Sequence, residues 1–179
     1  MQTAKQGVSR TRQVVAAVIG NALEWYDFIV YGFLASIIAR QFFPSEDEYA
    51  SLLMALATFG VGFFMRPVGG ILLGMYSDRK GRKAAMQLII RLMTVSIALI
   101  AFAPSYAAIG MGAPMLIVVA RMLQGFATGG EYASATAFLV ESAPAHRKGL
   151  YGSWQLVGQC LAVFGGAAMV ALVTHFFEP

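Results

Sequence analysis

The chain has 179 residues, of which 58% are hydrophobic and only 12% are charged, and its mean hydropathy is +0.66. Soluble domains usually carry about 25% charged residues. This composition therefore excludes an ordinary globular enzyme, a disordered tail and a nucleic-acid-binding domain, and it predicts that lipid surrounds the chain. The single cysteine, Cys160, allows neither an internal disulfide nor a multi-cysteine metal site, and we interpret it as a small apolar residue within a helix.

Apolar stretches long enough to cross a bilayer as helices, about 20 residues each, recur along the chain. There are five, at Val14–Ile38, Leu52–Tyr76, Ala84–Ala103, Ala113–Val140 and Tyr151–Val173. Polar breaks separate them at Arg40–Tyr49, Ser77–Lys83, Pro104–Gly112 and Glu141–Gly149. The sequence therefore predicts an all-α, polytopic membrane protein with about five transmembrane helices in residues 14–179, preceded by a polar N-terminal tail at 1–13.

Basic residues gather on one side of this predicted bundle. Nine of them fall in the N-terminal tail and in the second and fourth breaks: Lys5, Arg10, Arg12, Arg79, Lys80, Arg82, Lys83, Arg147 and Lys148. The other side carries only Arg40, beside three acids. The positive-inside rule then places the N-terminus in the cytoplasm of a multi-pass cell-membrane protein, and the lack of cysteine pairs is compatible with a bacterial inner membrane. The net charge of +4 is thus explained by topology and indicates no nucleic-acid partner.

Six charged side chains lie inside the predicted spans, where each costs roughly 2.5–3.5 kcal/mol if it has no partner. They are the acids Glu24, Asp27 and Glu131 and the bases Arg66, Arg91 and Arg121. Equal numbers of acids and bases allow full pairing, and we expect these groups to face one another or a wet cavity. At about 1.5 Å per residue, Glu24, Arg66 and Glu131 all lie roughly 15 Å from the inner boundary, close to the membrane midplane.

Helical periodicity places polar residues on one stripe in each of two spans. Asn21, Glu24, Asp27 and Tyr31 share an arc of about 120° in the first span, and Arg121, Gln124, Thr128 and Glu131 share an arc of about 80° in the fourth. The simplest arrangement is a central polar cavity between the two spans. The alternative is a set of ion pairs that only fix helix packing, and Arg91 suits that reading best because its side chain can reach the interface.

Four segments give the sequence a family resemblance. The segment Gly74–Lys83 reads GMYSDRKGRK and resembles the G-x-x-x-D-R-x-G-R-K signature loop of the major facilitator superfamily; within it, Gly81 suits a turn that needs positive φ. Arg121–Gly125 resembles the fourth-helix motif R-x-x-Q-G of the same superfamily. The stretches NALEWYDF from Asn21 and QGFATGGEY from Gln124 are similar to the metabolite:proton symporter branch, which includes symporters for citrate, α-ketoglutarate, shikimate, proline and betaine.

The resemblance implies proton-coupled symport of a small organic acid, such as citrate or a dicarboxylate, into the cell. Three readings stay open beside it: an osmolyte (proline or betaine) symporter, a truncated remnant that transports nothing, and a membrane-embedded enzyme. The last is disfavoured because the sequence offers no metal-ligand cluster and no triad-like grouping of Ser, Cys and His, and we expect no cofactor. Family members have twelve helices in two halves, so the chain resembles the N-terminal part, and we expect a C-terminal half or a second copy to complete the path.

The resemblance and the intramembrane charges together nominate site residues. Proton coupling is assigned first to Asp27 and then to Glu24 and Glu131, because a buried carboxylate favours its neutral form while a neighbouring arginine favours its charged form. Arg66 and Arg121 suit bidentate contacts to carboxylates. The full substrate-binding set is Arg66, Arg121, Gln124, Asn21 and Tyr31. The residues that hold one conformation are, by resemblance, Gly74, Asp78, Arg79, Gly81, Arg82 and Lys83.

Overall fold

The computed structural model describes the backbone of residues 10–177, and their side chains except at 10–13, 16–17, 82–83, 132–135, 137–138, 142 and 177. Residues 10–177 contain no strand. The helices are α1 (Arg10–Phe33), α2 (Ala35–Phe42), α3 (Glu48–Lys80), α4 (Arg82–Ala101), α5 (Tyr106–Ile109), α6 (Gly112–Ser142), the 3₁₀ turn η1 (Ala145–Arg147) and α7 (Lys148–Phe177). The all-α class predicted from the sequence is confirmed.

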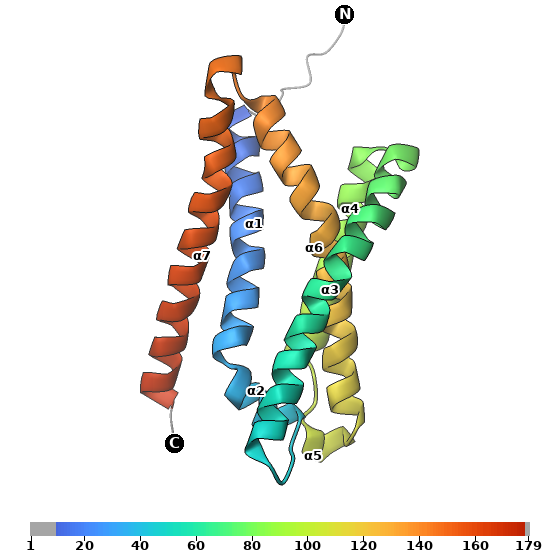
Figure 1. Ribbon diagram of the computed structural model, residues 1–179, viewed down its shortest axis with the longest axis vertical. Coiled ribbons are helices and arrows are strands. Elements are labelled where there is room, and N and C mark those ends of the chain that lie inside the picture. The colour runs from blue at the N-terminus through green and yellow to red at the C-terminus, as the bar shows by residue number, and fades with distance from the viewer. Residues whose placement is uncertain (1–9, 178–179) are drawn as a thin grey trace, which may run out of the picture.

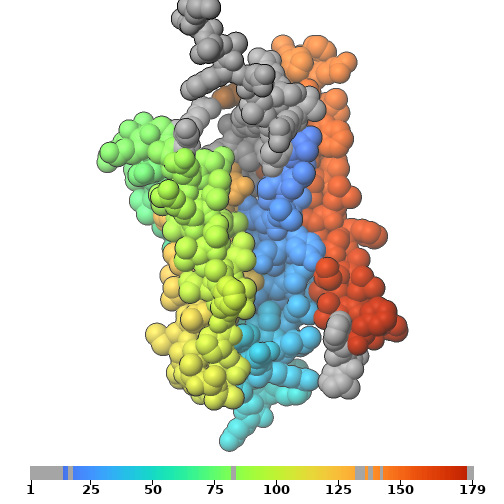
Figure 2. All heavy atoms as spheres, turned by 180° about the vertical axis from the view of Figure 1, so that it is seen from behind, coloured from blue at the N-terminus to red at the C-terminus, as the bar shows by residue number. Residues whose placement is uncertain are grey.

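The long helices form two groups that α6 joins (Figure 1). α1 packs mainly against α7, whereas α3 packs mainly against α6, which also contacts α4. α6 additionally contacts α1 and α7, so it touches every other long helix. Seen from behind, α4, α1 and α7 follow one another across the face of the bundle (Figure 2). This central place explains why α6 can bring polar residues of different helices together.

Membrane-spanning character is clearest for three helices. Among the described residues, Glu48–Lys80, Ala84–Ala101 and Ala145–Phe176 are long and apolar enough to cross a bilayer. A fourth candidate is the pair Val18–Phe33 and Ala35–Phe42, which counts only if the two bent helices form one span. The fifth expected span, α6, is 31 residues long. Over its described residues, it is not among the helices that are both long enough and apolar enough to cross a bilayer. All five apolar stretches therefore fold as helices, and up to four qualify as spans by length and composition.

The first apolar stretch is not the single straight helix that we expected. α1 and α2 meet at Leu34 with a bend of 68°. The bend follows Gly32, and glycine is a common site of helix kinks. It lets α2 bury Ala39 in a cluster with Tyr31 and Ala55, so tertiary packing accounts for the change of direction.

The polar break predicted at Ser77–Lys83 is much shorter in the structure. α3 continues to Lys80 and α4 begins at Arg82, so the helices are separated by Gly81 alone. Gly81 has φ +87°, a conformation that side chains with a Cβ rarely adopt, and its N–H donates to the carbonyl oxygen of Ser77 at 2.8 Å. A single glycine therefore turns the chain, and the basic residues on either side of it lie on helix ends.

Glycines let α3 and α6 touch backbone to backbone. A Cβ added at Gly125 would lie 1.9 Å from the carbonyl oxygen of Gly62, and one added at Gly69 would lie 1.8 Å from that of Phe126. A Cβ at Gly129 would lie 2.0 Å from the carbonyl oxygen of Arg66. Small residues at such spacing allow close approach of membrane helices. This contact fixes the level of α3 at which Arg66 meets α6.

The two ends of the bundle match the predicted partition of charge. The start of α1, the α3–α4 turn and the α6–α7 connection lie at one end, and α2 and α5 lie at the other (Figure 1). Between the ends, many large apolar side chains are exposed, among them Phe64 and Phe164. Such an exposed apolar surface is expected of helices that face lipid. The orientation with a cytoplasmic N-terminus stays a prediction.

Candidate functional site

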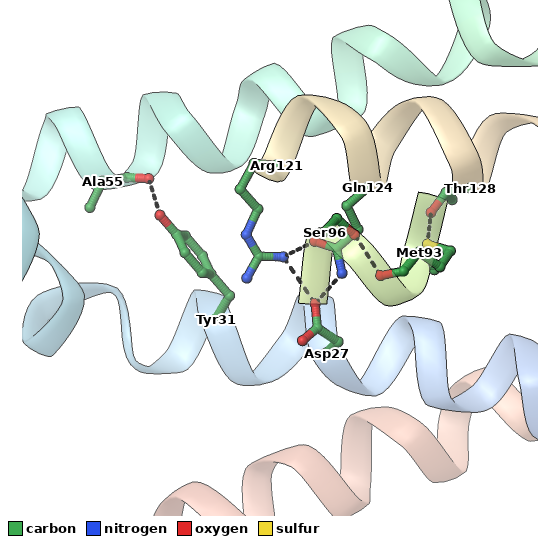
Figure 3. A network of polar contacts seen from close by, with 8 residues as sticks. All are labelled: Asp27, Tyr31, Ala55, Met93, Ser96, Arg121, Gln124 and Thr128. Carbon is green, nitrogen blue, oxygen red and sulfur yellow. Dashed lines mark hydrogen bonds and ion pairs between the residues drawn. The ribbon is translucent and has the colours of Figure 1, made fainter. Parts of the chain in front are cut away.

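The two polar stripes meet at Asp27 (Figure 3). Its Oδ2 accepts a hydrogen bond from Nη1 of Arg121 at 3.0 Å and another from Nε2 of Gln124. Nη1 of Arg121 also donates to Oε1 of Gln124. The Arg121 side chain is only 2% exposed, whereas that of Asp27 is 33% exposed. A carboxylate with one open side is thus clamped by two neighbours on α6.

Aromatic rings hold the Arg121 guanidinium from the other side. Its Cζ lies 3.9 Å from the ring centre of Tyr31 and 5.8 Å from that of Phe28. The Tyr31 hydroxyl donates to the carbonyl oxygen of Ala55 at 3.3 Å, which ties α1 to α3 (Figure 3). Nε of Arg121 has no hydrogen-bond partner among the described residues. Tyr31, expected to bind substrate, therefore contacts the arginine through its ring face.

Arg66 lies among aromatic rings, and no ion pair to it is found among the described side chains. Its Cζ is 4.3 Å from the ring centre of Phe63, 4.5 Å from that of Phe28 and 5.4 Å from that of Trp25. Nε and Nη2 of Arg66 are buried and have no hydrogen-bond partner within the described part of the chain. Cation–π attraction stabilises the charge on these ring faces. Two donor groups are left to bind an acceptor.

Glu24 and Glu131 occupy a region nearer the α3–α4 end of α1. Glu24 is 4% exposed, and neither of its carboxylate oxygens has a hydrogen-bond partner among the described residues. An added Cβ at Gly20, one turn before Glu24, would lie 3.6 Å from Oε1 of Glu131. Glu24 and Asp27 thus lie on neighbouring turns of α1, and Glu131 of α6 lies against α1 one turn before Glu24.

Asn21 contacts α7, a helix from which no site residue was predicted. Its Oδ1 accepts a hydrogen bond from Nε2 of Gln159 on α7 at 3.5 Å, and its Nδ2 has no partner among the described residues. Gln155, one turn away on α7, accepts a hydrogen bond from the Thr136 hydroxyl at 2.8 Å. Two glutamines at i and i+4 in an apolar span are the signal that was available for finding this side of the site.

The full pairing that equal numbers of acids and bases would allow is not found among the described residues. Within the described residues, the intramembrane charges form one ion pair shorter than 4.0 Å, between Arg121 and Asp27. Arg66 lies against rings instead of a carboxylate, and Arg91 is exposed on α4. Ring faces and an accessible surface are alternative ways to accommodate a guanidinium, which equal numbers of acids and bases do not reveal.

The signature segment, Gly74–Lys83, lies away from these contacts, at one end of the bundle. Asp78 and Arg79 are exposed, and an added Cβ at Gly74 would meet no atom within 4 Å. The side chains of Arg82 and Lys83 lie outside the described set. The conformational role expected for this segment therefore stays a prediction.

An open groove of about 520 Å³ runs along α1 and α7 beside the site. Its lining residues are Trp25, Leu156, Gln159, Cys160, Val163, Phe164 and Ala167. Cys160 is a free, exposed thiol on α7, so it borders this groove instead of filling a core. No group of three or more His, Cys, Asp and Glu side chains able to hold a metal occurs within the described residues.

Comparison with known proteins identifies relatives over nearly the whole chain. The family model described as sugar (and other) transporter matches residues 13–178. The chain is 42% identical to the citrate-proton symporter of Klebsiella pneumoniae over 176 residues, which is 98% of this chain and 40% of that protein. It is 41% identical to the proline/betaine transporter of Escherichia coli K12 over 163 residues (91% and 33%) and 40% identical to its shikimate transporter over 169 residues (93% and 39%). These relatives are transporters by name and not enzymes.

The chain thus spans about 33–40% of the length of these curated relatives. No solved structure matches it significantly.

Proposed function

The chain belongs to the sugar (and other) transporter family, a part of the major facilitator superfamily, and from that premise we propose that it takes part in proton-coupled symport of a small organic acid into the cell. The observation that carries the proposal is the carboxylate of Asp27, held on one side by Arg121 and Gln124 and open on the other. A buried arginine whose counter-ion is a partly accessible acid can exchange that acid for a substrate carboxylate.

Exchange of partners provides the coupling. A substrate carboxylate offers Arg121 the same bidentate acceptor that Asp27 offers. If Arg121 turns to the substrate, Asp27 loses its counter-charge at membrane depth, and an added proton restores neutrality there. Binding of the anion and binding of the proton then favour each other, as symport requires.

Arg66 supplies the second cationic group of the proposed site. Its unpartnered Nε and Nη2 gain hydrogen bonds when an anionic group binds, because a buried N–H without an acceptor costs about 1–3 kcal/mol. Asn21, whose Nδ2 is also unpartnered among the described residues, adds a neutral donor at the α7 side. Two arginines and an amide suit a di- or tricarboxylate better than an uncharged solute.

An osmolyte symporter is the second candidate, and one comparison favours it. The proline/betaine transporter of Escherichia coli is 41% identical to this chain, almost as similar as the citrate-proton symporter. Zwitterions also need both charge signs, and Asp27, Glu24 and the two arginines provide them.

The proposal places the chain in a bacterial inner membrane with a cytoplasmic N-terminus, where the basic end of the bundle faces the negative surface. Because the relatives are two to three times as long as the matched region, we propose that a second bundle completes the transport path. Further chain or a second copy of this one would provide it.

Uptake by proteoliposomes tests the proposal. Citrate, shikimate, proline and betaine are each offered with and without an acid-outside pH gradient. Gradient-driven accumulation of citrate supports the organic-acid reading, and accumulation of proline or betaine alone supports the osmolyte reading. No flux with any of the four, from protein shown to be inserted, contradicts transport by this chain alone.

Variants assign the residues. Asp27→Asn is expected to abolish pH-driven accumulation while membrane insertion is retained, and normal accumulation would refute its role. Arg66→Gln is expected to weaken citrate uptake at least tenfold. Arg91→Gln is the matched control, since Arg91 is an intramembrane arginine exposed on α4, and it should leave uptake unchanged.

A further inference from the structure

The three acids along α1 have different surroundings. Asp27 accepts hydrogen bonds from Arg121 and Gln124, and Nη1 of the Arg121 guanidinium lies 3.0 Å from its Oδ2. Glu24, one turn away, is almost fully buried, and the polar group that approaches its carboxylate from α6 is the neutral hydroxyl of Thr128 and not a cation. Pairs of acids whose environments differ in this way usually divide the ionised and the protonated roles between them.

The groups around Glu24 do not supply a paired counter-charge. Glu131 and Arg121 approach from α6, Arg66 approaches from α3, and Asp27 lies on α1 itself. Arg121 is already bound to Asp27, and Arg66 lies on the rings of Trp25, Phe28 and Phe63 without an ion pair to Glu24 shorter than 4.0 Å. The charged side chains that α7 carries in its described part, Lys148 and His175, lie at its two ends, and the partner it offers near Asn21 is the neutral Gln159.

The Glu131 carboxylate lies against α1 at the level of Gly20. Gly20 lies one helical turn before Glu24, and Oε1 of Glu131 lies 3.6 Å from the place of its missing Cβ. Gly20 and Glu24 are four residues apart, so Glu131 lies against the same face of α1 as Glu24, one helical turn away. When a buried carboxylate and a half-buried one adjoin in this way, they do not both ionise readily, and one proton between them removes the repulsion.

We propose that the Glu24–Glu131 pair carries one proton in this conformation while Asp27 is ionised, so that α1 holds two proton stations and not one. Glu24 and Asp27 are three residues apart, about 4.5 Å along the helix axis. When Arg121 leaves Asp27 for a substrate, the proton of the pair is the nearest one available to neutralise it. The relay rests on the proposed function, but the resident proton does not, because it follows from the packing of α1, α3 and α6 alone.

Infrared spectroscopy of the purified chain in lipid nanodiscs detects the resident proton directly. A protonated carboxyl has a C=O stretch that is absent from ionised carboxylates and shifts in heavy water. We expect this band in the wild-type protein at neutral pH, its loss in the double variant Glu24→Gln/Glu131→Gln, and its retention in Asp27→Asn. Glu46→Gln, at an exposed site, is the control and should leave the band unchanged.

The outcomes separate the proposals. A wild-type protein without the band, or a band that Asp27→Asn removes and the double variant keeps, overturns the two-station assignment. If circular dichroism shows that the double variant misfolds, the single variant Glu131→Gln replaces it, and an unchanged band position there overturns the pairing of the two acids. A band present in a protein that shows no uptake leaves the resident proton standing and refutes transport alone.

Discussion

Replacing Gly125 by alanine tests the physical basis of the α3–α6 contact. Alanine stabilises a helix interior by about 1 kcal/mol relative to glycine, so the local effect of the change is favourable. The tertiary effect is opposite, because the new Cβ would lie 1.9 Å from the carbonyl oxygen of Gly62. Ordinary contacts begin near 3.4 Å, and the opposing atom belongs to backbone that cannot rotate away. The helices must therefore separate by about 1.5 Å at this level.

The separation weakens packing along the whole interface. A gap of 0.5–1 Å already forfeits a quarter to a half of the dispersion energy of a contact. Insertion of extra methyl groups into tight cores costs about 1–3 kcal/mol, and we expect a value at the upper end, since backbone must move. The shift also carries Arg121, one turn before Gly125, away from its contacts with Asp27 and Tyr31.

Gly60→Ala is the matched control. Gly60 lies on α3 within one turn of Gly62, but an added Cβ there would meet no atom within 4 Å. Unfolding of both variants by denaturing detergent in mixed micelles, followed by circular dichroism, gives the two free energies. We expect Gly125→Ala to be destabilised by about 2–3 kcal/mol and Gly60→Ala to be unchanged or stabilised. Equal stabilities would refute the close backbone contact.

Three further changes have defined outcomes. Gly81→Ala forces a Cβ into φ +87° and should cost about 1–2 kcal/mol in thermal unfolding, whereas Gly81→Asn should cost less, since asparagine tolerates positive φ better; equal losses would contradict this turn. Tyr31→Phe removes the hydroxyl bound to Ala55 and should cost about 0.5–1.5 kcal/mol in detergent unfolding, while an unchanged protein would show that the bond is not formed. Trp25→Leu removes one of the rings around Arg66 and should weaken binding of citrate several-fold by calorimetry; tighter binding would contradict the ring contact.

Much of the fold could be predicted from the sequence, because a bilayer restricts which backbone structures can cross it. Long apolar stretches must form helices to satisfy their backbone groups, and all five did so. The bend at Leu34 and the continuation of α3 to Lys80 were not predicted. The first depends on how α2 packs against α3, and the second on the helix propensity of charged residues that hydropathy reads as a loop.

The sequence predicted that polar stripes of the first and fourth spans face each other, but it did not predict which side chains form hydrogen bonds or ion pairs. Angular placement along α1 and α6 was enough to bring Asp27 to Arg121, since each helix has one polar face. The surroundings of Arg66 were not predictable, because they depend on the level at which α3 meets α6, and glycine contacts set that level. Gln159 was not predicted as a site residue, because its amide carries no charge that would mark it as unusual in an apolar span.

Arg66 and Arg121 are both intramembrane arginines in the sequence, but the structure gives them different relations to an incoming anion. Arg121 has its acceptors already, so an anion must displace Asp27 to reach it. Nε and Nη2 of Arg66 have none among the described residues, so an anion that reaches these two groups displaces no hydrogen-bond acceptor from them. Binding at Arg66 is therefore the less costly first step, and transfer of the anion to Arg121 is the step that changes the charge at Asp27. Loss of Arg66 should then reduce affinity, and loss of Arg121 should separate proton movement from substrate movement.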